Sequence, residues 1–151
     1  MTPHVSHSVA DTERIARAMA VTLRGGDVVA LHGDLGAGKT QFTRGLVRGL
    51  GGDTTLVSSP TYMLLHIYPT PSLTVFHLDA YRVGGAEDFD AIGFDELLEQ
   101  NGVVVVEWPS RVADLLPTRT VHVTIETPGP DERTIRIDYR RSPADPLYSR
   151  P

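Results

Sequence analysis

The sequence predicts an α/β domain in which helices flank a mixed sheet that contains antiparallel hairpins. Segments with apolar residues at helical spacing alternate with short runs rich in β-branched residues. The run Val103 to Val106 consists of valine alone, which is typical of a strand covered on both faces. Two pairs of strand-like runs each enclose a proline-containing turn, which is typical of hairpins. Elements in this order predict layers of helix and sheet around one core.

The first half of the chain has the pattern helix, strand, helix. Asp11 has the position of a helix N-cap, and apolar residues follow it at helical spacing as far as Leu23. Val28 to Leu31 is a short apolar run that predicts a buried strand. A glycine-rich loop comes next, and then a second helix with one apolar face, which ends at Gly51-Gly52.

The second half contains both hairpins, a strand, two helical segments and a tail. The expected strands are Met63 to Ile67 and Leu73 to Leu78 around the turn Pro69 to Ser72, Val103 to Val106, and Thr120 to Ile125 and Thr134 to Tyr139 around Pro128-Gly129-Pro130. The expected helical segments are Asp88 to Gln100 and the short piece Val112 to Leu116. Residues 142–151 contain three prolines and are expected to be a disordered tail, so that residues 1–141 form a single domain.

Composition excludes several classes of site and predicts the compartment. The chain has 151 residues, no cysteine and a formal net charge of −5. Disulfides, thiolate metal sites and a cysteine nucleophile are therefore excluded. The acidic balance lacks the basic footprint of a nucleic-acid-binding protein. Residues 1–10 do not resemble a signal peptide, and no apolar run approaches the ~20 residues that span a bilayer, so we expect a cytoplasmic protein without membrane association.

A phosphate-binding motif occupies Gly33 to Thr40. The segment matches G-x-x-x-x-G-K-[ST] at every fixed position, and it lies between an expected strand and an expected helix. Glycines let backbone N–H groups turn towards phosphate oxygens, and the helix points the positive end of its dipole at the same place. In this motif, Lys39 reaches the β- and γ-phosphates and Thr40 offers its hydroxyl to Mg²⁺. The fold is therefore expected to resemble P-loop NTPases, with ATP and Mg²⁺ as ligands.

Two acidic residues follow strand-like runs and are candidates for the magnesium side of the site. Glu107 follows four valines in the Walker-B form, and Asp79 follows the run Val75 to Leu78. Open α/β sheets bind their ligands beyond the carboxyl ends of the strands, where both acids would lie. One acid is expected to hold Mg²⁺, directly or through water, and the other to orient the attacking water. An acidic residue that merely keeps a strand end solvated is the alternative for either one.

Four segments in this order resemble the TsaE (YjeE) family of small bacterial ATPases. They are Gly33 to Thr40, Ser59-Pro60-Thr61-Tyr62, His77-Leu78-Asp79-Ala80-Tyr81-Arg82 and Val106-Glu107-Trp108, and the resemblance covers residues 8–140. That family supports synthesis of threonylcarbamoyladenosine, the modified adenosine beside the anticodon of many transfer RNAs. The resemblance implies a Mg-dependent, ATP-hydrolysing subunit that acts on a TsaB–TsaD complex, in which TsaD carries out threonylcarbamoyl transfer. It also implies that the subunit does not bind nucleic acid directly, in agreement with the acidic charge.

The resemblance also implies roles for individual residues. Thr61 would belong to a switch-like loop near the γ-phosphate, Asp79 would be a magnesium-side acid, and Glu107 would be an acid needed for hydrolysis. Thr40, Asp79 and Glu107 are the expected metal-side residues. The expected nucleotide-binding set is Gly33, Asp34, Leu35, Gly36, Ala37, Gly38, Lys39, Thr40, Gln41 and Trp108.

Other functions and roles stay open from the sequence. A small-molecule kinase would use the same P-loop, although no arginine-rich lid segment stands out, and a non-catalytic ATP-dependent switch would have almost the same sequence. A GTPase is less favoured because no Asn-Lys-x-Asp segment is present. Arg82 would either act as an arginine finger or cover a sheet edge. Three histidines on or beside expected strands, His32, His66 and His77, are interpreted as packing or hydrogen-bonding residues rather than zinc ligands.

Overall fold

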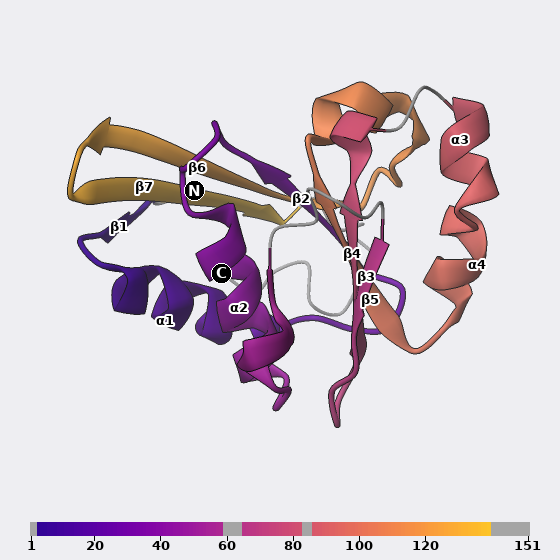
Figure 1. The fold of residues 1–151 in the computed structure, drawn as a ribbon, viewed down its shortest axis with the longest axis horizontal. Coiled ribbons are helices and arrows are strands. Elements are labelled where there is room, and N and C mark those ends of the chain that lie inside the picture. Colours follow the sequence, from indigo (N-terminus) through magenta and orange to yellow (C-terminus); the bar gives the residue numbers. More distant parts are fainter. Residues whose placement is uncertain (1–2, 59–64, 83–85, 140–151) are drawn as a thin grey trace.

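The computed structural model describes residues 3–58, 65–82 and 86–139, and these form a seven-stranded mixed sheet with helices on both faces (Figure 1). The strands are β1 (His4–Ser6), β2 (Val28–His32), β3 (Leu65–Tyr68), β4 (Thr74–Asp79), β5 (Gly102–Glu107), β6 (Val121–Gly129) and β7 (Glu132–Tyr139). The α-helices are α1 (Val9–Ala20), α2 (Lys39–Gly49), α3 (Ala86–Ala91) and α4 (Phe94–Glu99). Three 3₁₀ segments are η1 (Thr54–Leu56), η2 (Ala80–Arg82) and η3 (Pro109–Leu115). The predicted fold class is confirmed.

The centre of the sheet is parallel and its flanks are antiparallel. The strand order is β1-β7-β6-β2-β5-β4-β3, with parallel pairing between β6 and β2, β2 and β5, and β5 and β4. The outer pairs β3–β4 and β6–β7 are antiparallel, as the two predicted hairpins require. In register, Leu31 pairs with Glu107 and Glu107 with Asp79. The carboxyl ends of β2, β5 and β4 therefore meet at one edge of the sheet.

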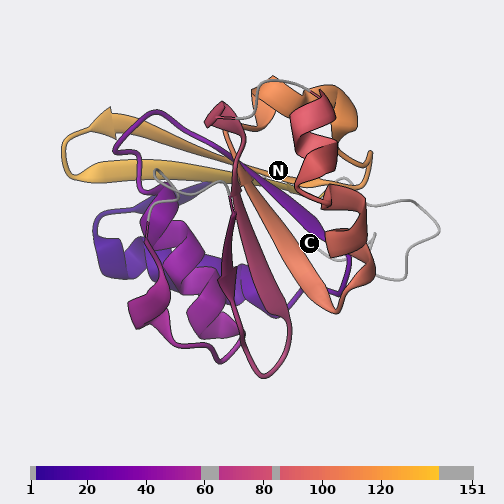
Figure 2. The same cartoon turned by 45° about the vertical axis from the view of Figure 1, so that its right-hand side comes forward.

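Each face of the sheet has its own apolar core. Helices α1 and α2 cover one face, where Phe42 and Leu46 of α2 pack with valines of β2 and β5 (Figure 1). Helices α3 and α4 cover the other face beside β4 and β5, where Phe94 and Leu97 are buried (Figure 2). Residues Val103 to Val106 are fully buried between these layers, as their all-valine sequence predicts.

Four local predictions need correction. The first helix begins at Val9, because the Ser8 hydroxyl caps it by accepting from the Asp11 backbone N–H at 3.0 Å, so Asp11 lies in the first turn. The helix expected over residues 88–100 is two helices, because Gly93 adopts a left-handed conformation (φ 81°) between them. The segment around Val112 is part of a 3₁₀ segment that begins at Pro109. The second hairpin turns at Pro130-Asp131, since β6 continues to Gly129 with a register irregularity after Glu126.

Some features lie beyond what the sequence predicted or what the structure describes. Strand β1 was not expected, and it pairs antiparallel with β7 at the edge of the sheet. Residues 63–64 of the first expected hairpin and the expected tail, 142–151, lie outside the described residues. In the described part of the chain, no helix has the length and apolar character needed to cross a membrane.

Candidate nucleotide-binding site

The glycine-rich loop connects the end of β2 to the start of α2 in a conformation that depends on glycine. Gly36 and Gly38 have φ values of 82° and 112°, a region that residues with a Cβ rarely adopt. Gly38 is the N-cap of α2, so the loop delivers the chain directly into the first turn of the helix. Backbone N–H groups in that turn have no partner within the helix, and an anion placed there would supply acceptors.

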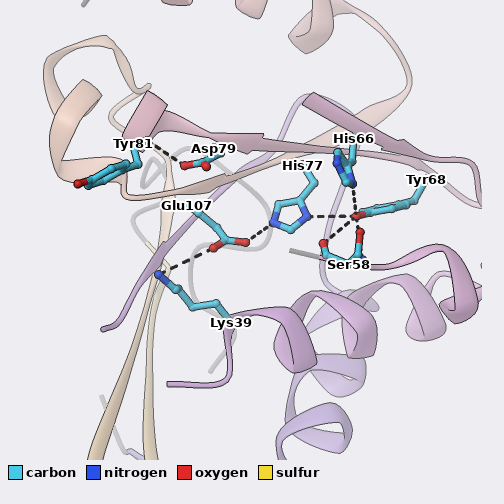
Figure 3. Close-up of polar contacts among 8 residues, drawn as sticks. All are labelled: Lys39, Ser58, His66, Tyr68, His77, Asp79, Tyr81 and Glu107. Atoms are coloured by element: carbon cyan, nitrogen blue, oxygen red, sulfur yellow. Dashed lines mark hydrogen bonds and ion pairs between the residues drawn. The ribbon is translucent and has the colours of Figure 1, made fainter. Parts of the chain in front are cut away.

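Lys39 is a buried cation at the start of α2. Its Nζ lies 3.8 Å from Oε1 of Glu107 and 4.0 Å from the centre of the Trp108 ring (Figure 3 shows the contact with Glu107). Burial lowers the pKa of Lys39 from its ordinary 10.5, while the carboxylates of Glu107, Asp79 and Asp34 act in the opposite direction. The amine is therefore held by charge and by an aromatic face in a place where water does not solvate it fully.

The two candidate acids lie side by side at the carboxyl edge of the sheet. Asp79 ends β4, Glu107 ends β5, and the two are register partners in the parallel pair, so their side chains point to the same face. Both are buried. Asp79 Oδ1 accepts a hydrogen bond from the backbone N–H of Tyr81 at 3.0 Å, which holds the carboxylate beside η2. The sequence-based expectation that both acids lie at neighbouring strand ends is confirmed.

Trp108 follows Glu107 in a backbone conformation that is unusual for a large side chain. Its φ is 57°, the one positive value among the described residues other than glycine. Such residues occur where the surrounding structure over-determines a strained conformation, often at functional sites. The Trp108 ring lies 5.4 Å from that of Tyr81, and the guanidinium of Arg111 lies 5.2 Å from the Tyr81 ring. The Trp108 residue is only partly buried, and its ring faces the Lys39 ammonium.

These residues line a single pocket of about 850 Å³, within the ~300–1,000 Å³ common for small-molecule sites. The pocket is lined by Leu35, Gly36, Gly38, Lys39, Thr40, Gln41, Asp79, Tyr81, Glu107 and Trp108. The other residues of the expected nucleotide-binding set face elsewhere. Gly33 and Asp34 line a separate hollow beside β6 and β7, and Ala37 lines a third pocket at the start of α1. The P-loop therefore has pockets on more than one side.

Known proteins resemble this chain over most of its length. The model of the family described as "Threonylcarbamoyl adenosine biosynthesis protein TsaE" matches residues 6–135. The chain belongs to the TsaE family. Among its relatives, the tRNA threonylcarbamoyladenosine biosynthesis protein TsaE of Treponema pallidum is 41% identical over 133 residues, which cover 88% of this chain and 97% of that protein. The Bacillus subtilis protein of the same name is 39% identical over 125 residues, which cover 83% of this chain and 77% of that protein.

A solved structure supports the same conclusion at the level of the fold. The crystal structure of Bacillus subtilis YdiB has a TM-score of 0.76 to this chain at 31% identity, and the match covers 93% of this chain and 86% of that one. The fold is therefore shared across most of the chain.

Two further residues of this TsaE protein contact the site, and the sequence analysis did not assign them to it. Arg133, on β7, donates from Nε to the Ala37 carbonyl at 2.9 Å and so holds the P-loop from outside. His77 is wholly buried and its Nε2 lies 2.5 Å from Oε2 of Glu107 (Figure 3). The hydrogen-bonding interpretation of His77 is correct, but sequence spacing carries no signal that its partner is Glu107, thirty residues away.

The side chains of two expected site residues lie outside the described part of the structure. Thr61 lies in residues 59–64, outside the described residues. The backbone of Arg82 is part of η2, while its side chain is outside the described part of the structure. Their expected roles stay predictions.

Proposed function

We propose that this TsaE protein binds ATP with Mg²⁺ in the pocket around Lys39 and hydrolyses it in the synthesis of threonylcarbamoyladenosine in transfer RNA. The observation that supports this proposal best is the convergence of a P-loop lysine and threonine with two neighbouring carboxylates in one pocket. Lys39 and Thr40 begin α2, whereas Asp79 and Glu107 end β4 and β5, so the sheet and the helix supply opposite walls.

The residues of the pocket suit Mg²⁺ bound together with a nucleotide. Among the described residues, no group of three or more His, Cys, Asp or Glu could hold a metal ion unaided. Mg²⁺ usually binds through one or two carboxylates together with waters and substrate phosphates, and the Thr40 hydroxyl, Asp79 and Glu107 are donors of this kind. The ion would neutralise charge on the phosphate oxygens and align the triphosphate.

The protein's own groups divide the work between binding and orientation. The Lys39 ammonium is positioned to neutralise phosphate charge, and its burial makes that interaction stronger than it would be in water. Glu107 is the better candidate to orient or activate the attacking water, because its Oε1 faces Lys39 while its Oε2 is held from behind. Asp79, whose Oδ1 is tied to the Tyr81 N–H, is the better candidate for the magnesium side.

The nucleoside end of ATP is proposed to lie in the pocket at the start of α1. This pocket of about 270 Å³ shares Gly36, Gly38 and Gln41 with the larger one, so a triphosphate crossing the loop would lead from one to the other. Its wall includes Val9, an apolar side chain that is 56% exposed. Contact with a nucleoside would remove that apolar surface from water.

TsaB-like and TsaD-like proteins are the proposed partners, as the family resemblance implies. ATP turnover would then reset or remodel that complex, without direct contact between this chain and the modified base. The deciding measurement is phosphate release from Mg·ATP by the purified chain, alone and with both partners. We expect slow hydrolysis that rises when the partners are added.

Two variants make the measurement specific to the proposed site. Lys39→Ala should abolish nucleotide binding, while Glu107→Ala should keep binding and lose roughly 10²-fold or more in turnover, as for loss of a positioned base. Normal hydrolysis by Glu107→Ala would refute the role given to that residue. Tight ATP binding without turnover or stimulation would favour a passive switch, and phosphate transfer to an added acceptor would favour a kinase.

A further inference from the structure

A buried chain of polar contacts leads from the pocket along one face of the sheet. It runs from Lys39 to Glu107, then to His77 and on to Tyr68, whose hydroxyl lies 3.4 Å from His77 Nδ1 (Figure 3). The Tyr68 hydroxyl also donates to the Ser58 carbonyl at 3.2 Å. His77 has no exposed surface, so the chain is shielded from solvent at its centre.

We propose that His77 is a positioning residue that fixes the carboxylate of Glu107 for ATP hydrolysis. The inference rests on the proposed function and adds a residue for which that function has so far given no role. His77 on β4 and Glu107 on β5 point to the same face of the sheet, since His77 pairs with Val105 and Asp79 with Glu107. His77 acts behind the carboxylate, on the side away from Lys39.

The contact with His77 fixes the orientation of the Glu107 carboxylate. An ionised carboxylate only accepts hydrogen bonds, so Nε2 of His77 must donate to Oε2. With Oε2 held at 2.5 Å, rotation of the carboxylate is restricted and Oε1 stays turned towards Lys39. A group that orients water needs one oxygen kept in place facing the reactant, and this contact supplies that constraint.

Tyr68 holds the other side of the imidazole ring. Burial raises the pKa of the Tyr68 phenol, so the hydroxyl stays protonated and neutral. Its contacts with His77 and with the Ser58 backbone hold the oxygen beside the imidazole ring. A buried histidine left without partners would cost free energy; here Nε2 contacts Glu107 and Nδ1 lies 3.4 Å from the Tyr68 oxygen.

A purely packing role does not explain why position 77 is a histidine. Two residues that flank it on the same face, Val75 on β4 and Val105 on β5, are apolar and fully buried, and an aliphatic side chain would continue that layer without desolvating an imidazole. Buried polar groups that orient an active-site ligand or carboxylate are typical of sites where geometry limits activity.

Three substitutions separate positioning from packing. His77→Gln can place its amide N–H near the position of Nε2 and so can still donate to Glu107. His77→Asn is shorter, so its amide reaches only the Nδ1 position and loses Glu107. His66→Gln is the matched control, because His66 is the cross-strand neighbour of His77 and contacts the same Tyr68 hydroxyl but not Glu107.

The measurement is single-turnover hydrolysis of Mg·ATP by the full chain with its partners, together with the nucleotide Kd of each variant. His77→Asn should lower turnover about 10–100-fold, the usual size for loss of a residue that orients a reactive group, with an unchanged Kd. His77→Gln should regain most of that loss, and His66→Gln should match the wild type. Wild-type turnover in His77→Asn, or equal losses in the Asn and Gln variants, would overturn the inference.

A spectroscopic measurement tests the contact without relying on turnover. The imidazole N–H that donates to Glu107 should give a slowly exchanging, downfield proton NMR signal that disappears in His77→Gln and moves in Glu107→Gln. Absence of that signal in the wild type would overturn the inference directly. By contrast, no hydrolysis by the wild type and by His66→Gln would count against the proposed ATPase function, so the two failures are distinguishable.

Discussion

Lys39 is a cation that the fold has partly removed from water before any phosphate arrives. Its neighbours within reach are Glu107 and the Trp108 ring, and desolvation outweighs the attraction of the nearby carboxylates in setting its pKa. Such a lysine gains more from a bound polyanion than an exposed one would, because the triphosphate adds negative charge in a poorly solvated place. Burial of Lys39 by the fold therefore strengthens its attraction for a polyanion.

The lowered pKa of Lys39 gives a pH-dependent stability with a definite sign. The folded protein binds this proton less tightly than the unfolded chain does, so raising the pH towards the ordinary value of 10.5 should favour the folded wild type. We expect the unfolding free energy of the wild type to rise relative to that of Lys39→Met over this range. Chemical denaturation of both proteins without nucleotide at several alkaline pH values checks this, and a constant difference would contradict it.

Val9 tests which way the nucleotide lies. If the nucleoside occupies the pocket at the start of α1, Val9→Glu should weaken ATP binding about tenfold or more, because it replaces an apolar contact with the nucleoside by a hydrated charge. Binding of inorganic tripolyphosphate should change much less. Val21→Glu is the matched control, since Val21 is exposed at the other end of α1. Equal loss for ATP and tripolyphosphate would contradict the proposed orientation.

Single residues differed in how far the sequence could predict them. The P-loop was predictable because its geometry is local and depends on glycines at fixed spacing, two of which have positive φ values. Glu107 and Asp79 were predictable because both follow apolar runs that end in acids. The roles of His77 and Arg133 were not, because each depends on a partner that only the packed sheet brings near.

The pair α1 and α2 shows how small residues bring two elements into close contact. A Cβ on Gly45 would lie 2.4 Å from the Glu13 carbonyl oxygen and 2.7 Å from the Cβ of Ala16. Gly49 has a similar relation to Ala20, with a distance of 2.6 Å. Glycine is thus required about two and three turns beyond the start of the helix that carries Lys39, which ties the position of α2 to α1.

Gly45→Ala should destabilise the protein although alanine favours helix formation. The gain in helix propensity is about 1 kcal/mol, whereas overpacking typically costs about 1–3 kcal/mol and here involves backbone atoms that cannot rotate away. We therefore expect a net loss of stability and a lower Tm by thermal denaturation. Gly129→Ala is the control, because a Cβ there meets nothing within 4 Å. A higher Tm for Gly45→Ala would show that the helices separate at little cost.

Elements were predicted well where many apolar residues follow a regular spacing, and the ends of elements were predicted less well. The helix over residues 88–100 was divided by a left-handed glycine that leaves the apolar spacing intact on both sides. Strand β1 has only three residues, and two of them are exposed, so it has no alternation to detect. Its pairing with β7 rather than its own sequence makes it a strand.

The whole molecule depends on strand order, and apolar periodicity alone could not specify this order. The sequence indicated the hairpins, but it did not show that β2 lies between β5 and β6. This arrangement places the P-loop beside Glu107 and, one strand further, Asp79. Long-range pairing of this kind is decided by the packing of both sheet faces together.

The described sheet ends at Tyr139, which predicts the effect of shortening the chain. Tyr139 pairs with Val121, so a chain that stops after Arg141 keeps every strand pair. We expect the same Tm and the same phosphate release as for the full chain. A chain that stops after Pro130 lacks β7 and should not fold, because β1 would lose its partner strand and β6 one of its two. A Tm several degrees lower for the chain ending at Arg141 would show that the tail contributes contacts.

The position of β2 also bears on how the protein is made. Val29 of β2 pairs with Val105 and Val121, residues that a ribosome adds long after β2 has left the exit tunnel. Strand β2 therefore stays without its partner strands, and its apolar side chains stay uncovered, until most of the chain has been synthesised. The unpaired β2 is therefore the segment most in need of chaperone protection during synthesis.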